Sequence, residues 1–558
     1  MPRAAVGKIR QRPTLRIAAA ERESIRRLDM AKKEKRVDVP NQGHRHLFGS
    51  TEKSDFILNM DFNGAQKMCS RFCMLAIAIV TLILIPAYYT QNTLMYVEDD
   101  MPHYLSDNFI FYAASMVMLT GGVGYLVFNV ARQKGLVDLK GSKLLTLPVI
   151  CMLTTLISSL TAASLHDSIL GFMGRHDGFL MTFGCFGLFA VAAALNDKDR
   201  KKQLADFIVG AGVLQSLAGI LEVIPATSGA MCNFFDRLYQ RPGLAEDADP
   251  SLGELFVSPE ESPTSWGIYT DTKAASGFLT SPHALAVILA VAFPIALAGI
   301  AFDKNKTRRV LYGIAAPIMA AAACLTKVWS GAVCIAAAAF FVTIFAVIKA
   351  AKGEKSALAV LIPVACSGII AGALFGTGAV KFADEQIIFT DSYVNRMIGY
   401  ERRRDYINQV TDPATDDRSI YDYLFGDGEN IMMKYPAFGV GPDNAPYHYP
   451  EFTLTLDRTY NEFTDTGAQK GIITLVLYAA FLIVTAVKGF KLLNKFVKGK
   501  GDWVSAAALA AVLTYMAQSW FNTTWFSATY MFFIAAGLCW DISVKNKDSK
   551  AVEDSAES

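Results

Sequence analysis

Residues 283–302 read HALAVILAVAFPIALAGIAF, a run of 20 residues without Asp, Glu, Lys or Arg. A helix rises about 1.5 Å per residue, so a run of this length crosses the roughly 30 Å hydrocarbon core of a bilayer. The chain has 558 residues, of which 52% are hydrophobic and only 19% are charged. This composition excludes a set of soluble domains, because their surfaces would need far more charge. The sequence therefore predicts an all-α, polytopic membrane protein.

Twelve such apolar stretches follow one another along the chain, each bounded by charged or turn-forming residues. They lie near 70–90, 107–130, 143–165, 178–195, 204–225, 283–302, 308–328, 331–349, 357–378, 471–489, 502–520 and 523–541. The segment before the first stretch is rich in Lys and Arg and has no apolar signal-peptide core near Met1. Because basic segments stay in the cytoplasm, we expect the amino terminus inside and, after twelve spans, the carboxyl terminus inside as well.

The loops between the stretches alternate in charge, which supports this count. Loops predicted inside are rich in Lys and Arg, whereas loops predicted outside carry more Asp and Glu. Two of the outer loops, 226–282 and 379–470, are far longer than the usual connections of a helical bundle, so we expect function there. The chain then divides into a basic cytoplasmic tail (1–66), a membrane domain (67–542) and a disordered cytoplasmic tail (543–558).

Several classes of function are disfavoured by charge and by cysteine spacing. The formal net charge of +2 does not suit a strongly basic nucleic-acid-binding protein, so nucleic acid is not an expected partner. No Cys or His pair has the spacing of a zinc site. We therefore expect neither a metal nor another cofactor.

Polar side chains on the predicted outer face are the candidates for chemistry. Arg175 lies in the turn Gly174-Arg-His-Asp-Gly178. A guanidinium there can snorkel to the headgroup level or bind a phosphate through two parallel hydrogen bonds. His283 begins the sixth apolar stretch, where a histidine is most often solvated. The segment Tyr460-Asn-Glu462 precedes the tenth stretch and can be a polar helix start or part of a site.

Six separated segments share their order and spacing with the motifs of one family. They are Gly174-Arg-His-Asp-Gly-Phe-Leu180, Gly277-Phe-Leu-Thr-Ser-Pro-His-Ala-Leu285, Trp329-Ser-Gly331, Arg418-Ser-Ile-Tyr421, Tyr435-Pro-Ala-Phe-Gly-Val-Gly-Pro-Asp-Asn444, and Tyr460-Asn-Glu462 followed by Gly467 to Gly471. Together they run from about 171 to 490, over half of the chain. This ordered set resembles the O-antigen ligase and O-antigen polymerase superfamily of bacterial membrane glycosyltransferases.

The resemblance implies a metal-independent, inverting transferase at the outer face of a bacterial cytoplasmic membrane. Such an enzyme takes a glycan from undecaprenyl diphosphate and joins it to an acceptor sugar. Its expected partners are the lipid-linked oligosaccharide donor, a glycan acceptor, membrane lipid and envelope-assembly proteins. By the resemblance, Arg175 and Arg418 are the preferred cations for the leaving diphosphate. Arg402, Arg403 and Arg404 are secondary candidates, because such a cluster also suits lipid headgroups.

The chain departs from the family pattern at Tyr460, which stands where ligase members have a histidine proposed to activate the acceptor hydroxyl. A phenol with a pKa of about 10 is a poor base near neutral pH. The side chains that can replace it as base are Glu462, Asp443, His448 and His283. Asp443, Asn461 and His448 are in addition expected to bind substrate. Gly331 stands where the family often has an arginine, so the choice between ligase and polymerase stays open.

Two functions of other classes stay open beside the transferase. Twelve helices with both termini inside also describe a transporter or flippase for polysaccharide or lipid-linked sugar, without catalytic activity. Against it, the two halves of the chain show no convincing repeat, and the apolar stretches contain few ionisable residues. The third alternative is a non-catalytic scaffold of an envelope-assembly complex.

Overall fold

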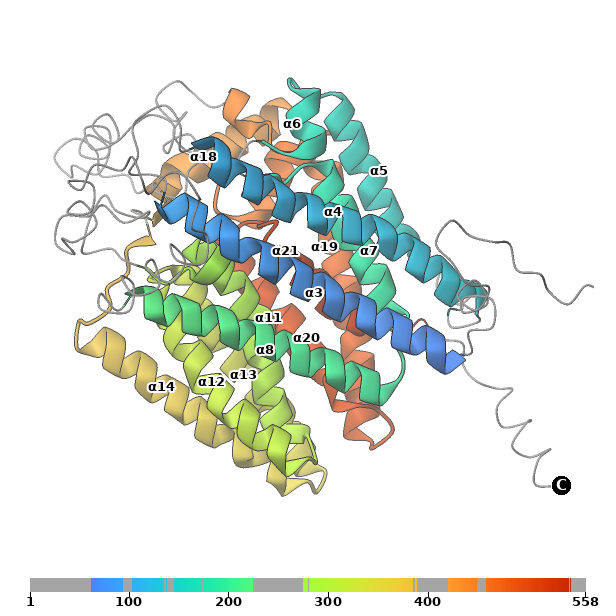
Figure 1. Ribbon diagram of the computed structural model, residues 1–558, viewed down its shortest axis with the longest axis vertical. Coiled ribbons are helices and arrows are strands. Elements are labelled where there is room, and N and C mark those ends of the chain that lie inside the picture. The colour runs from blue at the N-terminus through green and yellow to red at the C-terminus, as the bar shows by residue number, and fades with distance from the viewer. Residues whose placement is uncertain are drawn as a thin grey trace, which may run out of the picture. The chain divides into compact units, whose positions relative to one another are not determined.

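The computed structural model describes residues 62–93, 103–134, 137, 145–172, 175–223, 274–279, 281–384, 387–388, 420–448, 458–540 and 542 (Figure 1). They fall in a compact unit that begins at Phe62. They form helices joined by turns, so the all-α prediction is confirmed for this part of the chain.

The α-helices are α3 (Phe62–Thr93), α4 (His103–Gln133), α5 (Thr146–Leu160), α6 (Leu165–Leu170), α7 (Phe179–Ala193), α8 (Lys198–Val223), α11 (Pro282–Phe302), α12 (Lys306–Leu325), α13 (Trp329–Ala351), α14 (Leu361–Gly376), α18 (Ile420–Lys434), α19 (Glu462–Val497), α20 (Trp503–Gln518) and α21 (Thr529–Leu538). The 3-10 helices are η4 (Gly277–Leu279), η5 (Lys355–Val360), η6 (Ala445–His448) and η7 (Ser519–Phe521).

Within the described ranges, nine helical segments are long and apolar enough to cross a membrane, which makes the chain a multi-pass membrane protein. Three further helices, α5, α7 and α21, are apolar but contain only 15, 15 and 10 residues. They lie in the predicted stretches 143–165, 178–195 and 523–541. Each of the twelve predicted stretches therefore contains a helix, although the helices differ in length.

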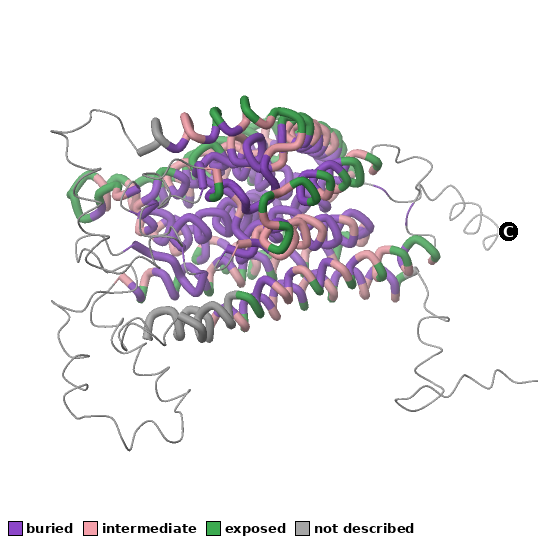
Figure 2. Tube along the Cα trace, turned by 90° about the horizontal axis from the view of Figure 1, so that it is seen from above, coloured by how far each residue is buried: buried purple, intermediate pink, exposed green. Residues whose placement is uncertain are grey.

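The centre of the bundle is α11, the helix that contains the apolar run quoted above. All of its 21 residues are buried, and it contacts α8, α12, α13, α20 and α21. A helix that is apolar on every side is stable only when other helices surround it. Figure 2 shows buried residues throughout the interior of the bundle and exposed residues along its edges.

The helix α14 lies at the edge of the bundle in Figure 1. Only 17% of the apolar window in its span is buried, and the side chains of Ile362 and Ile369 are each 70% exposed. Exposed aliphatic side chains on a helix of this length are suited to contact with lipid chains. This helix therefore faces the hydrocarbon and takes little part in the core.

A break in α19 fixes one of the motif segments to the bundle. Gly471 has φ 83° and ψ 163°, which interrupts the helix between its short first part and its long second part. A Cβ atom at this position would lie 2.3 Å from the carbonyl oxygen of Ala437, so no side chain fits. Backbone hydrogen bonds join the two segments, from Ile472 to Pro436 (2.8 Å), from Val440 to Ala468 (3.2 Å) and from Gly441 to Gln469 (2.8 Å). The segment 435–444 is thereby held against the break.

Candidate functional site

Arg175 and Asp443 form a buried ion pair that joins two motif segments 268 residues apart in the chain. The Arg175 Nη2 atom lies 3.1 Å from Asp443 Oδ1 and donates to the Asp443 carbonyl oxygen at 3.2 Å. Their side chains are only 3% and 2% exposed. The guanidinium also lies 5.2 Å from the ring centroid of Phe172. Arg175 therefore fixes the turn after α6 to the segment before η6.

The Asp443 carboxylate is further occupied by the backbone of the Arg175 turn. Its Oδ2 atom accepts hydrogen bonds from the amides of Phe172 (2.9 Å) and Asp177 (2.8 Å). Its own amide donates to Gln469 Oε1 at 2.8 Å, which holds this residue at φ +56°. Because this carboxylate is bonded to other groups of the protein, Asp443 has a structural role here and holds the Arg175 turn in place.

Asp177, Thr524 and Arg458 continue this network toward the turn between α20 and α21. The Thr524 hydroxyl donates to Asp177 Oδ2, and Arg458 Nη1 donates to the Thr524 carbonyl oxygen at 2.6 Å. Arg458 is 2% exposed, and its guanidinium carbon lies 4.3 Å from the ring centroid of Trp525. Its Nη2 atom has no hydrogen-bond partner among the described residues, which is costly for a buried guanidinium.

His283 lies at the first turn of α11, beside Tyr460 and Asp384. Its Nε2 atom is 3.4 Å from Asp384 Oδ1, and its ring centroid is 4.8 Å from that of Tyr460. The side chains of His283 and Asp384 are 0% and 2% exposed. The expectation of a solvated histidine at this helix start is wrong, because the segments that carry Asp384, Tyr460 and Asn522 cover it.

Asn461 and Glu462 start α19 and are held by bonds of their own. The Asn461 Oδ1 atom accepts from the amides of the first helical turn, at 3.0 Å each, which caps the helix. Its Nδ2 atom donates to the Trp520 carbonyl oxygen at 3.1 Å. The Glu462 carboxylate accepts from the hydroxyls of Tyr478 (2.5 Å) and Ser519 (2.6 Å). Both residues are buried, so they are tied into the bundle.

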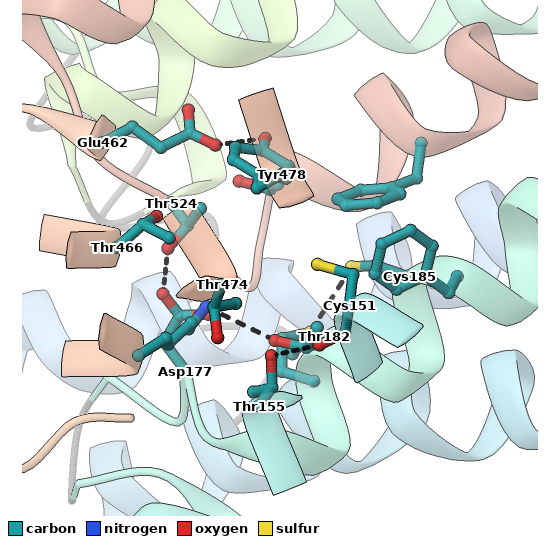
Figure 3. Close-up of a pocket in the computed structure, with 15 residues that line it drawn as sticks. Cys151, Thr155, Asp177, Thr182, Cys185, Glu462, Thr466, Thr474, Tyr478 and Thr524 are labelled. Atoms are coloured by element: carbon teal, nitrogen blue, oxygen red, sulfur yellow. Dashed lines mark hydrogen bonds between the residues drawn. The ribbon is translucent and has the colours of Figure 1, made fainter. Parts of the chain in front are cut away.

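A cavity of about 40 Å³, lined by both apolar and polar side chains, lies beside this network and has room for a few water molecules (Figure 3). Asp177 and Glu462 stand at its wall, joined to Thr524 and Tyr478 as Figure 3 shows. The ammonium of Lys470 also lines it and donates to a threonine hydroxyl at 3.5 Å. The threonines that line the cavity are Thr155, Thr182, Thr466, Thr474, Thr524 and Thr529.

Burial changes the acid–base behaviour of the turn that carries Arg175. Burial lowers the pKa of His176 from its ordinary 6.5 to about 4, and nearby Arg175 also favours the neutral ring while Asp443 opposes the shift. Burial raises the pKa of the Asp177 carboxyl, and the Asp443 charge adds to this effect, while Lys470 and Arg458 counteract it. The turn therefore favours a neutral imidazole and a carboxylic acid that holds its proton more firmly than usual.

The remaining predicted residues lie apart or outside the described ranges. His448 ends η6 and contacts the Tyr435 ring at a centroid distance of 5.3 Å, and partial burial lowers its pKa. Arg418 and the cluster Arg402, Arg403 and Arg404 lie outside the described residues, as do the segments 226–273 and 389–419 of the long loops.

Three charged residues of the site escaped the sequence analysis, namely Arg458, Asp384 and Lys470. Arg458 lies two residues before Tyr460, so its place next to a motif was a usable signal. Lys470 lies inside the segment Gly467 to Gly471, where a lysine between glycines was equally visible. Asp384 carried no signal, because nothing in the sequence links it to His283, 101 positions earlier.

The arrangement brings a partly unpaired cation, a histidine–carboxylate pair and a hydroxyl-lined cavity into one connected cluster. The cation is Arg458, the pair is His283 with Asp384, and Thr524 links Arg458 to the cavity wall. Such groups can stabilise an anion and exchange a proton. Comparison with models of known protein families and with curated protein sequences returns no match.

Proposed function

We propose that this protein is an inverting glycan transferase that uses an undecaprenyl-diphosphate-linked donor at the outer face of a bacterial cytoplasmic membrane. It is O-antigen ligase-like or polymerase-like and serves the synthesis of a surface polysaccharide. The observation that carries the proposal is the contact between separated motif segments. Arg175 meets Asp443, and His283 meets Tyr460, although only their order along the chain suggested a common role.

The membrane topology that goes with this proposal has twelve spans and both termini in the cytoplasm. The nine long helical segments count as spans, and α5, α7 and α21 are the other three. This count places the site residues outside. The acceptor and the lipid-linked donor then meet at the headgroup level.

In the proposed reaction an acceptor hydroxyl attacks the anomeric carbon of the donor sugar. The new C–O bond forms as the bond from that carbon to the diphosphate oxygen breaks, and undecaprenyl diphosphate leaves with the bonding electrons. The developing negative charge needs fixed cations. Arg175 is already paired with Asp443 and orients the turn, so we assign the diphosphate to Arg458 and Arg418, with the cluster of Arg402, Arg403 and Arg404 near the headgroup.

The test is a transfer assay on the purified protein in lipid vesicles with a lipid-linked oligosaccharide donor and a glycan acceptor. The wild-type protein should release undecaprenyl diphosphate and form a glycosidic bond. Arg458→Ala and Arg418→Ala should each lower turnover by about 10²-fold or more, because a fixed cation at developing charge is worth that much. Arg175→Ala should do the same by releasing the turn.

Arg308→Ala serves as the matched control, because Arg308 pairs with Asp206 at the predicted inner end of the bundle. Its turnover should equal that of the wild-type protein. Thermal unfolding in detergent identifies any variant that has lost its fold. Unchanged turnover in both Arg458→Ala and Arg418→Ala would contradict the proposal that these two arginines stabilise the leaving diphosphate.

A transporter for a lipid-linked sugar is the second candidate, and the ionisable side chains that line the cavity favour it. Asp177, Glu462 and Lys470 lie on that cavity in the bundle, which is the kind of intramembrane charge that coupled transport uses. The same vesicles decide between the candidates. Movement of the lipid-linked sugar across the bilayer without a new glycosidic bond supports transport and contradicts the transferase.

A further inference from the structure

The pair of His283 and Asp384 has the geometry of a proton-accepting dyad. The His283 Nε2 atom lies 3.4 Å from Asp384 Oδ1, within ion-pair distance but outside hydrogen-bond geometry, and catalytic contacts of this kind often tighten when substrate binds. Asp384 Oδ1 also accepts from the Trp329 amide at 3.2 Å, whereas the buried Asp384 Oδ2 has no hydrogen-bond partner in the described part of the chain. A carboxylate in this position can orient the imidazole and stabilise it when it becomes charged.

The backbone of His283 is held by hydrogen bonds, and its imidazole packs against two aromatic rings. The Ser281 hydroxyl caps the start of α11 by accepting from the His283 amide at 3.1 Å, and Asn522 Nδ2 donates to the His283 carbonyl oxygen at 2.9 Å. The Trp525 ring stacks nearly parallel to the imidazole, with an angle of 13° and a centroid distance of 6.4 Å. The Tyr460 ring packs against it at 4.8 Å. Tyr460, which stands where ligase members of the family have a histidine, therefore packs against His283 at the start of α11.

We propose that His283, oriented by Asp384, accepts the proton of the acceptor hydroxyl in the transfer described above, an inference that rests on the proposed function. The acceptor oxygen forms its bond to the anomeric carbon while its proton passes to the imidazole. The diphosphate leaves from the opposite face, and the Asp384 carboxylate compensates the positive charge on His283. His283 is the catalytic residue, Asp384 is the positioning residue, and Tyr460 is a wall of the site.

The other candidate bases are less suited to this role by their contacts. Glu462 is engaged by two hydroxyl donors, and Asp443 by Arg175 and two backbone amides. The dyad instead lies close to the cation that we assign to the diphosphate, because Trp525 contacts both His283 and Arg458. Acid–base and charge-stabilising groups thus share one aromatic neighbour.

The experiment measures release of undecaprenyl diphosphate as a function of pH for His283→Gln and Asp384→Asn. His283→Gln should lower kcat by about 10²- to 10⁴-fold, the usual contribution of a general base, while the KM for the donor stays the same. Asp384→Asn should lower kcat less and shift the acidic limb of the pH profile. Asp384→Glu, which keeps the carboxylate, should restore part of the rate.

His166→Gln is the matched control, because the His166 side chain is 75% exposed and lies outside the cluster. It should leave kcat and the pH profile unchanged. A His283→Gln variant that keeps wild-type kcat, or an Asp384→Asn variant with an unaltered pH profile, overturns the dyad and leaves the transferase standing. If His283→Gln fails to fold, the nearly isosteric Asp384→Asn alone decides. A wild-type protein that transfers no glycan to any acceptor refutes the proposed function and the dyad with it.

Discussion

His176 is the most exceptional residue of the turn that carries Arg175. It has φ +50°, a conformation uncommon for residues other than glycine, although histidine adopts it more often than most. Its ring centroid lies 5.4 Å from that of Phe111 and 6.5 Å from that of Phe526, and neither ring nitrogen has a hydrogen-bond partner among the described residues. An imidazole in such surroundings favours its neutral form, chiefly because burial removes the water that would solvate the charge, and nearby Arg175 adds to this effect.

This environment makes the stability of the fold depend on pH. Because the pKa of His176 falls from 6.5 to about 4 on folding, the unfolded chain binds a proton between these values that the folded chain does not. The contribution of His176 to stability is therefore fully present above pH 6.5 and is lost as the pH falls toward 4, by on the order of 3 kcal/mol in total. Thermal unfolding in detergent at a series of pH values measures this loss.

His176→Asn separates this effect from those of other groups. Asparagine tolerates the same backbone conformation but has no proton to gain in this range. The raised pKa of Asp177 works in the opposite direction, because its contribution is lost as the pH rises. The informative quantity is therefore the difference between the wild-type protein and His176→Asn. The exposed His166→Asn is the control, and an equal pH slope in the wild-type protein and His176→Asn would contradict the assignment.

At the scale of elements, the break in α19 decides where the motif segment 435–444 lies. The first part of α19 carries Glu462 and Lys470 beside the cavity, and the second part has the length and apolar character of a membrane span. Gly471 permits both the φ of +83° and the close approach of the Ala437 carbonyl. Gly471 thus allows α19 both to carry the cavity residues in its first part and to span the membrane with its second part.

Gly471→Ala should destabilise the protein by about 1–3 kcal/mol or more, because alanine strains at positive φ and its Cβ would overlap the facing backbone. Its melting temperature in detergent should fall clearly below that of the wild-type protein. Gly368→Ala on α14 is the matched control, since a Cβ there meets nothing within 4 Å. It should be neutral or slightly stabilising through helix propensity. Equal melting temperatures for the two variants would show that the break is unimportant.

The sequence was informative about elements and much less so about contacts. Apolar length alone predicted the position of every long helix, because the bilayer imposes that length on a span. It also placed Glu462 and Lys470 just before the tenth apolar stretch, but it did not reveal the cavity that both residues line. Arg175 was expected to face a phosphate, but it pairs with Asp443. Pairing between residues this far apart depends on tertiary packing, which periodicity does not encode.

At the scale of the whole molecule, the orientation in the membrane is the prediction on which the function depends. Two exposed lysines lie on opposite predicted sides, Lys304 in the turn after α11 and Lys381 after α14. In a background with Cys232 and Cys366 replaced by serine, a membrane-impermeant maleimide should label Lys381→Cys in intact cells. It should label Lys304→Cys only after the membrane is opened. Labelling of Lys304→Cys in intact cells would contradict the predicted orientation and would mean that the site faces the cytoplasm.

The complete burial of α11 also has a consequence for biosynthesis. The helix is made before α12, α13, α20 and α21, all of which later contact it. During synthesis α8 precedes it and α12 and α13 follow it directly, but its cover is completed only by α20 and α21. Because those two helices lie more than 200 residues downstream, a ribosome that stops early leaves α11 inserted but incompletely covered. Quality control in the membrane then has a simple feature to detect, a helix without charge that still faces lipid.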